Sequence, residues 1–154
     1  MTHAATKYNP WVAYVVAREE ARRTGSRRVG TEHLFLALLR EPEIAETVGV
    51  TVQQARLALD ALDQSALGVL GIHTTDHAGP VPMRAIPSRV TMKTTLRDRL
   101  PMTPAAKAAL ERAWKPRRRG TPFRAADVLR ELIALTPPDP VGELLAALHI
   151  NERN

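Results

Sequence analysis

The 154-residue chain presents the same order of segments twice, and this repetition constrains its fold more than any other sequence feature. In each half a long amphipathic run leads into a basic, glycine-containing loop, a second apolar run, a proline break and a short apolar segment. Laying "VGTEHLFLALL" over "FRAADVLRELI" matches Val29 with Phe123, Leu34 with Val128 and Leu38 with Leu132. Such self-similarity indicates an internal duplication.

The repeated runs have helical periodicity and helical end signals. In "PWVAYVVAREEARR", residues 10–23, Pro10 suits a first helical position. Thr51 followed by Gln54 is the pattern of a capping box, and Thr103 precedes Pro104 as an N-cap would. Aromatic residues make up only 4% of the chain, so Ala, Leu and Val must form the core. In the first run the apolar residues share one face, opposite Arg and Glu: Trp11, Val12, Val15, Val16 and Ala17.

These signals predict an all-α protein with helices over about 31–40, 44–48, 52–67, 103–119, 124–135 and 141–150 besides the first. Residues 68–101 differ, because glycine and proline interrupt every periodic run there. We therefore predict a first repeat over 1–67, a long irregular linker over 68–101 and a second, degenerate repeat over 102–154, together forming one compact domain.

The stretch "EEARRTGSRRVGTEHLFLALLREPE", from Glu19 to Glu41, resembles the N-terminal repeat domain of Clp unfoldases, especially the ClpC type. The opening "MTPAAKAALERA" is similar to the corresponding helix of the second copy. The resemblance covers about residues 8–67 and 102–151 and implies two pseudo-symmetric four-helix repeats. The second copy departs from the pattern: it lacks the last helix and has Ala125, Ala126 and Asp127 where the family has threonine, glutamate and histidine.

Two interpretations of "GTEH" follow from the residues alone. In the structural one, Gly30 makes the turn, Thr31 caps the helix, Glu32 opposes the helix dipole and His33 bonds a neighbouring helix or loop. In the functional one, the helix N-terminus and Thr31 bind an anion, Arg27 and Arg28 add positive charge, and Glu32 takes a guanidinium.

The resemblance implies two binding surfaces. ClpC-type domains use the threonine and glutamate of this motif to bind phosphoarginine on marked proteins, which carries over to Thr31 and Glu32; Ala126 leaves the second copy without the glutamate. In actinobacterial ClpC-type domains, cyclic peptide antibiotics bind where the first helices of the two copies meet. The matching positions here are His3, Trp11, Met102, Lys107 and Glu111.

Other chemistry finds little support in the sequence. No phosphate-binding G-x-x-x-x-G-K-[ST] loop is present, so the ATPase of an unfoldase is absent. The chain has no cysteine, and its serines lie in no G-x-S-x-G motif. His73, Asp76 and His77 have ligand-like spacing but lie in the linker without further ligands. We expect no enzyme activity, no metal and no cofactor.

The leading hypothesis is a non-enzymatic module that captures client or adaptor proteins of the Clp system, or sequesters cyclic peptide antibiotics. The alternative is a small basic nucleic-acid-binding protein, indicated by the net charge of +6 and by Lys115, Arg117, Arg118, Arg119 and Arg124. We disfavour it, because two flanking aromatics make a weak stacking platform. The sequence has no export signal and no run of about 18 apolar residues, which predicts a cytoplasmic protein without a membrane span.

Overall fold

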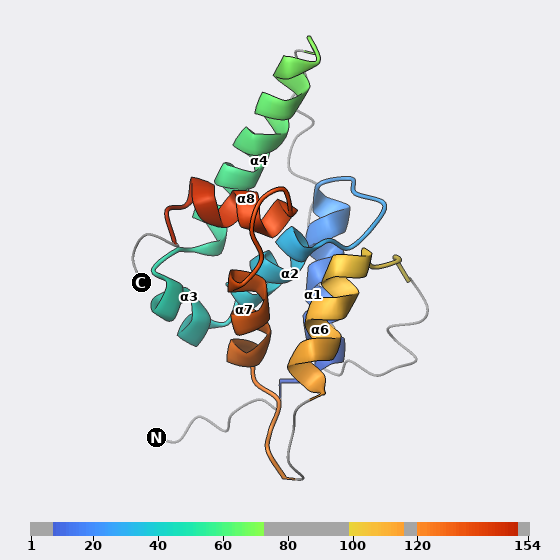
Figure 1. Ribbon diagram of the computed structural model, residues 1–154, viewed down its shortest axis with the longest axis vertical. Helices are drawn as coiled ribbons and strands as arrows, with labels where there is room; N and C mark the ends of the chain where they lie inside the picture. Colours follow the sequence, from blue (N-terminus) through green and yellow to red (C-terminus); the bar gives the residue numbers. More distant parts are fainter. Residues whose placement is uncertain (1–7, 73–98, 116–119, 151–154) are drawn as a thin grey trace.

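The computed structural model describes residues 8–72, 99–115 and 120–150. Within these ranges the chain forms helices and no β-strand (Figure 1), which confirms the all-α prediction. The helices are α1 (Pro10–Arg23), α2 (Thr31–Leu38), α3 (Pro42–Val48), α4 (Val52–Val69), α6 (Pro104–Trp114), α7 (Ala125–Ile133) and α8 (Pro140–Ala147).

The helix ends follow the capping signals of the sequence at several places. The side chain of Thr51 accepts a hydrogen bond from the backbone N–H of Gln54 (3.2 Å), whose side chain accepts one from the N–H of Thr51 (2.9 Å). Thr103 Oγ1 accepts from the N–H of Ala106 at 3.3 Å. Asn9, which the sequence analysis did not single out, caps α1 in the same way. These side chains satisfy backbone donors that a helix start leaves without a partner.

The core is centred on α2. This helix is buried almost all round, because its residues are apolar on every side. Helix α1 packs against α2, helix α6 packs against α7, and α8 contacts α2, α4 and α7. The largest fully buried apolar side chains come from α2, α7 and α8: Leu34, Phe35, Leu36, Leu38, Leu132, Leu144 and Leu145.

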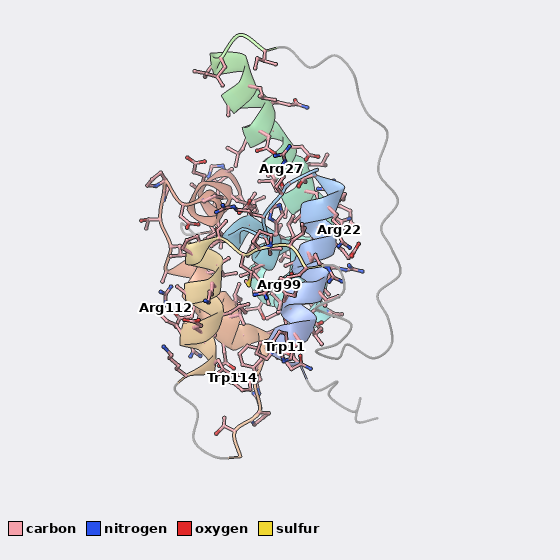
Figure 2. The ribbon with its side chains drawn as sticks, turned by 90° about the vertical axis from the view of Figure 1, so that its right-hand side faces the viewer. Trp11, Arg22, Arg27, Arg99, Arg112 and Trp114 are labelled. Atoms are coloured by element: carbon pink, nitrogen blue, oxygen red, sulfur yellow. The ribbon has the colours of Figure 1, made fainter. Side chains whose placement is uncertain are left out.

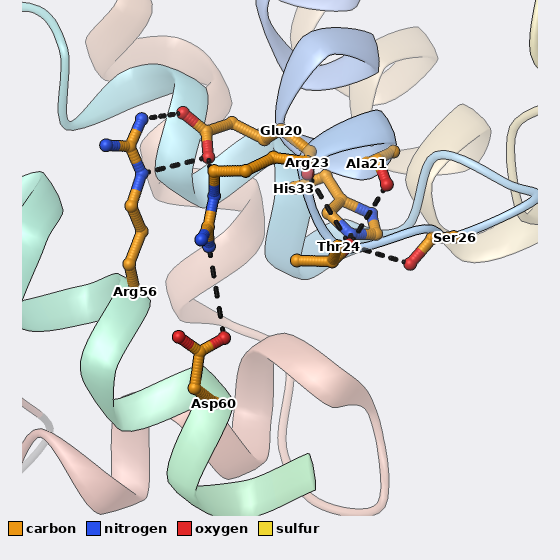
Figure 3. A network of polar contacts seen from close by, with 8 residues as sticks. All are labelled: Glu20, Ala21, Arg23, Thr24, Ser26, His33, Arg56 and Asp60. Atoms are coloured by element: carbon orange, nitrogen blue, oxygen red, sulfur yellow. Dashed lines mark hydrogen bonds and ion pairs between the residues drawn. The ribbon is translucent and has the colours of Figure 1, made fainter. Parts of the chain in front are cut away.

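The charged side of α1 is a correction to the sequence analysis. The sequence placed Arg and Glu on the face opposite the apolar residues, yet Arg18, Glu19 and Glu20 are buried, while Trp11 on the apolar face is 42% exposed. Glu20 receives Arg56 from α4 through Nε (3.1 Å) and Nη2, and Arg23 through Nε at 3.3 Å (Figure 3). A buried carboxylate needs such partners. The network therefore ties α4 to α1.

The two repeats exchange contacts at their entry segments. Val29, which precedes α2, pairs with Met102 in a parallel bridge through Val29 N to Pro101 O and Thr103 N to Val29 O, both 2.9 Å. In the second repeat Phe123, the counterpart of Val29, stacks on Tyr8 with ring centroids 5.9 Å apart. Met102 and Tyr8 each lie two residues ahead of the proline that begins their helix. The pseudo-symmetry expected from the repeat thus extends to the contacts between its copies.

The segment that enters the second repeat is also fixed to the first helix. The hydroxyl of Tyr14 accepts from Leu100 N (2.9 Å) and donates to Leu100 O (2.7 Å). Most of the expected linker, 73–98, lies outside the described residues, so the division of the chain into 1–67, 68–101 and 102–154 stays a prediction. None of the helices described is long and apolar enough to cross a membrane.

Candidate functional site

The start of α2 is built differently from either interpretation of the sequence. Gly30, not Thr31, is the N-cap, so the predicted capping role of Thr31 is wrong. Thr31 is the first helical residue and is buried; its hydroxyl donates to Asp139 Oδ1 at 2.6 Å. The N–H of Val141 points at both oxygens, 3.3 Å from Thr31 Oγ1 and 3.0 Å from Asp139 Oδ1. Because Asp139 caps α8, this hydroxyl joins the two repeats.

His33 has the structural role that the residues predicted. Its Nδ1 accepts from the N–H of Gly30 at 2.9 Å, and its Nε2 lies 3.4 Å from Thr24 Oγ1. The Thr24 hydroxyl in turn lies 3.0 Å from Ala21 O and 2.9 Å from Ser26 Oγ (Figure 3). Burial lowers the pKa of His33 to about 4, so the ring is neutral near pH 7. With Nδ1 as acceptor, the proton belongs on Nε2.

Glu32 is the residue of the "GTEH" motif with hydrogen-bonding capacity to spare. Its side chain is 17% exposed, and Oε2 is buried without a hydrogen-bond partner. Burial raises the pKa of Glu32; a hydrogen bond from its own backbone opposes the rise, and the charges of Asp139 and Asp63 add to it. The carboxyl folds back over Gly30, since a Cβ on that glycine would lie 2.7 Å from Glu32 Cδ. Glu32 Oε2 is therefore a hydrogen-bond acceptor without a donor, and other carboxylates lie near it.

The positive charges expected around this acceptor lie apart from it. Arg27 (Figure 2) and Arg28 are exposed on the loop between α1 and α2. Among the described residues, neither forms an ion pair with Glu32. The Thr31 hydroxyl already donates to Asp139, and the N–H of Gly30 already donates to His33. Near Glu32 the arrangement therefore favours a guanidinium or ammonium group over an anion.

The corresponding position of the second repeat keeps the cap and lacks the ligand groups. Asp127 Oδ2 accepts from the N–H of Arg124 at 2.9 Å, as His33 does from Gly30 in the first repeat. Ala125 and Ala126 supply neither hydroxyl nor carboxylate at this helix start. Both repeats thus have the hydrogen bond that closes the helix start, but only the first has the hydroxyl and the carboxylate.

The residues expected to form an antibiotic surface are only partly gathered. His3 lies outside the described residues. Trp11 is exposed at the start of α1, Met102 is half-buried, and Lys107 and Glu111 are exposed on α6 with Nζ and Oε1 3.9 Å apart. We expected these residues where α1 and α6 meet; the segment of Arg99 passes across the outer side of these two helices (Figure 2).

Sequence reasoning missed Asp139 and Asp63 at the Glu32 site. The pair Asp139–Pro140 is a helix-start signal that could have identified the cap, but nothing in it shows that Thr31 is its partner. His73, Asp76 and His77 lie outside the described residues, within which no group of three or more metal-ligating side chains occurs. Of the basic run, Lys115 and Arg124 are exposed, and 117–119 lie outside the described residues.

The comparisons with known proteins agree with the repeat architecture. The family model of the Clp repeat (R) N-terminal domain matches residues 10–120. This is well over half of the chain, so the protein belongs to the Clp repeat N-terminal domain family. No curated protein and no solved structure gives a significant match. The chain is thus an N-terminal module of the Clp system, from a non-catalytic domain family whose members bind Clp-system partners, and the match gives no support to the nucleic-acid alternative.

Proposed function

We propose that the protein is a non-catalytic module that captures client or adaptor proteins of the Clp system by accepting an arginine side chain at Glu32. One observation carries the proposal: Glu32 Oε2 is buried without a partner, next to the charges of Asp139 and Asp63. An unpaired buried carboxylate oxygen costs free energy in the unbound protein. A guanidinium would supply the missing donors in a charge-assisted, two-pronged bond.

Phosphoarginine on a marked client is the proposed ligand in its most specific form. Its guanidinium would bind Glu32, while Arg27 and Arg28, exposed ahead of the same helix, would receive the phosphate. Thr31 would join only by exchanging Asp139 for a phosphate oxygen, because its hydroxyl already donates to that carboxylate. The guanidinium part of the ligand is therefore better supported than the phosphate part.

The test is a calorimetric titration of phosphoarginine, and separately of arginine, into the parent chain and into Glu32→Gln. We expect Glu32→Gln to weaken binding at least about tenfold, since a hydrogen bond to a charged group contributes about 1.5–3 kcal/mol. The matched control is Glu43→Gln, which changes an exposed glutamate in the first turn of α3 and should leave affinity unchanged. Parent protein that binds neither ligand, or equal affinity in Glu32→Gln, would contradict the proposal.

Unfolding of the same variant distinguishes a binding group from a structural one. Glu32→Gln removes a charge that burial and two neighbouring carboxylates disfavour, so we expect the unbound protein to become more stable at pH 7. Urea unfolding of parent and variant measures this difference. A variant that loses both binding and stability would show that Glu32 supports the fold.

A second proposal is that the surface of α1 beside Arg99 binds cyclic peptides. Its support is the exposure of Trp11, a large aromatic residue of which 42% of the surface is accessible to a ligand. Titration of a ClpC-directed cyclic peptide, followed by binding to Trp11→Ala, tests it. Leu57→Ala is the control, because Leu57 is also exposed but lies on α4.

A further inference from the structure

Helix α4 carries an apolar seam that continues beyond the body of the protein. Along the helix, apolar residues recur at spacings that alternate between three and four, which places them on one face. We call this the α4 seam: Val52, Ala55, Leu59, Leu62, Ala66 and Val69. Ala55 and Leu59 are buried, Leu62 is half-buried, Ala66 is exposed and Val69 is 87% exposed. The same face thus passes from core to solvent within one helix.

The seam is uncovered because the helices that cover its first half end too soon. Helix α4 has 18 residues and α8 has eight, which gives lengths of about 27 Å and about 12 Å. The outer half of α4 stands clear of the remaining described helices in two perpendicular views (Figures 1 and 2). Leu70, directly after the helix, is 74% exposed, and no atom lies within 4 Å of the Cβ position of Gly68.

The charges beside the uncovered seam have one sign. Asp60 and Asp63 are the only charged residues of segment 57–72, although the whole chain has 22 Lys and Arg against 16 Asp and Glu. Asp63 follows Leu62 along one edge of the seam, whereas Asp60 lies toward the far side of the helix, where its Oδ1 is 4.0 Å from Arg23 Nη2. The edge of this apolar surface is therefore acidic in a protein that is basic overall.

The sign of these charges decides the occupant. A second copy of α4 would bring two acidic edges together, which disfavours self-association through the seam. A helix whose apolar stripe is flanked by Lys and Arg would cover Ala66, Val69 and Leu70 and place positive charge against Asp63. We propose that the outer half of α4 is a docking surface for a basic amphipathic helix of a partner protein; Asp63 borders both this surface and the Glu32 site, whereas Ala66, Val69 and Leu70 belong to this surface alone.

The probe that tests this surface is a fluorescein-labelled model peptide about three heptads long, with Leu at its apolar positions and Lys beside them. Fluorescence anisotropy measures its binding to the full chain. We expect Val69→Asp to weaken binding at least about tenfold, because a carboxylate cannot be buried in an apolar contact without a partner. Leu57→Asp is the matched control: Leu57 is an exposed leucine of α4 that lies off the seam, and its change should leave affinity unaltered.

Two further measurements keep the outcome decisive. Asp63→Asn should weaken binding of the Lys peptide several-fold and reduce its salt dependence, without altering the seam. A peptide with Glu in place of Lys should not bind measurably. The proposal is overturned if the Lys peptide does not bind, if Val69→Asp and Leu57→Asp bind equally, or if sedimentation shows a dimer that Val69→Asp dissociates. Because Glu32→Gln leaves the seam intact, loss of arginine binding in that variant does not affect this test.

Discussion

At the scale of single residues, neither interpretation of the "GTEH" motif holds for all of its members. The structural one fits His33, and the functional one fits Glu32. His33 is a structural residue, Thr31 is bonded across to the second repeat, and Glu32 alone presents an acceptor without a partner. The predicted bond of His33 to a neighbouring segment is found at Thr24, whereas its bond to Gly30 N–H was not predicted. The sequence could not identify the bond of Thr31, because Asp139 lies 108 positions along the chain.

His33 also gives the protein a predictable dependence of stability on pH. Its pKa in the folded chain is about 4, against 6.5 for an ordinary histidine. Between these values the unfolded chain holds a proton at this position that the folded chain does not, so stability falls as pH falls through the window. The loss should reach roughly 2–3 kcal/mol by pH 4.5, since each pKa unit corresponds to about 1.4 kcal/mol.

The variant His33→Asn isolates this contribution. Its side-chain oxygen can accept from the N–H of Gly30, as the oxygen of Asp127 does at Arg124, but it does not titrate. We expect urea unfolding at pH 7 and pH 4.5 to show a smaller loss of stability in the variant than in the parent. The raised pKa values of Glu32 and Asp63 act in the opposite direction and are common to both proteins. Equal losses in the two proteins would exclude His33 as the source.

At the scale of elements, the helices were predictable and their faces were not. Caps and prolines mark the starts of α1, α4 and α6 within a residue, because these signals are local. The burial of Glu20 was missed, because a charged residue reads as solvent-facing unless its partner is known. That partner, Arg56, comes from another helix.

Helix α8 depends on a glycine in its first turn. A Cβ at Gly142 would lie 2.6 Å from Pro137 N and 2.8 Å from Thr136 Cα, and backbone atoms cannot move aside as a side chain can. We expect Gly142→Ala to destabilise the fold by about 1–3 kcal/mol, the usual cost of overpacking. Thermal unfolding measures the effect. Gly68→Ala serves as the control, with no neighbour within 4 Å, and should be neutral or slightly stabilising.

At the scale of the whole molecule, the exchanged entry segments predict that the two repeats unfold together. Each repeat contains one tryptophan, Trp11 in α1 and Trp114 in α6, so Trp11→Phe and Trp114→Phe each leave a reporter for one half. We expect both reporters to give one transition with the same midpoint, because Val29–Met102 and Tyr8–Phe123 cross between the halves.

Thr31→Val should shift both reporters equally. It removes a hydroxyl bonded to Asp139 of the second repeat, at a cost of about 1–2 kcal/mol. Denaturant unfolding followed by fluorescence measures the two midpoints. A shift confined to the variant that retains Trp11 would show that the first repeat unfolds by itself.

The reciprocal contacts Val29–Met102 and Tyr8–Phe123 have the form of an isologous interface, in which surface i of one subunit meets j of the other and j meets i. The two repeats of this one chain therefore pack against each other as the two different subunits of a heterodimer do. One subunit keeps the hydroxyl and the carboxylate at its helix start; the other has alanine at both positions and still completes the shared interface. Such a division allows the side chains at the helix start of one repeat to change while its contacts with the other repeat are kept. Alanine at position 126 removes a binding group but no contact that the first repeat needs in order to fold.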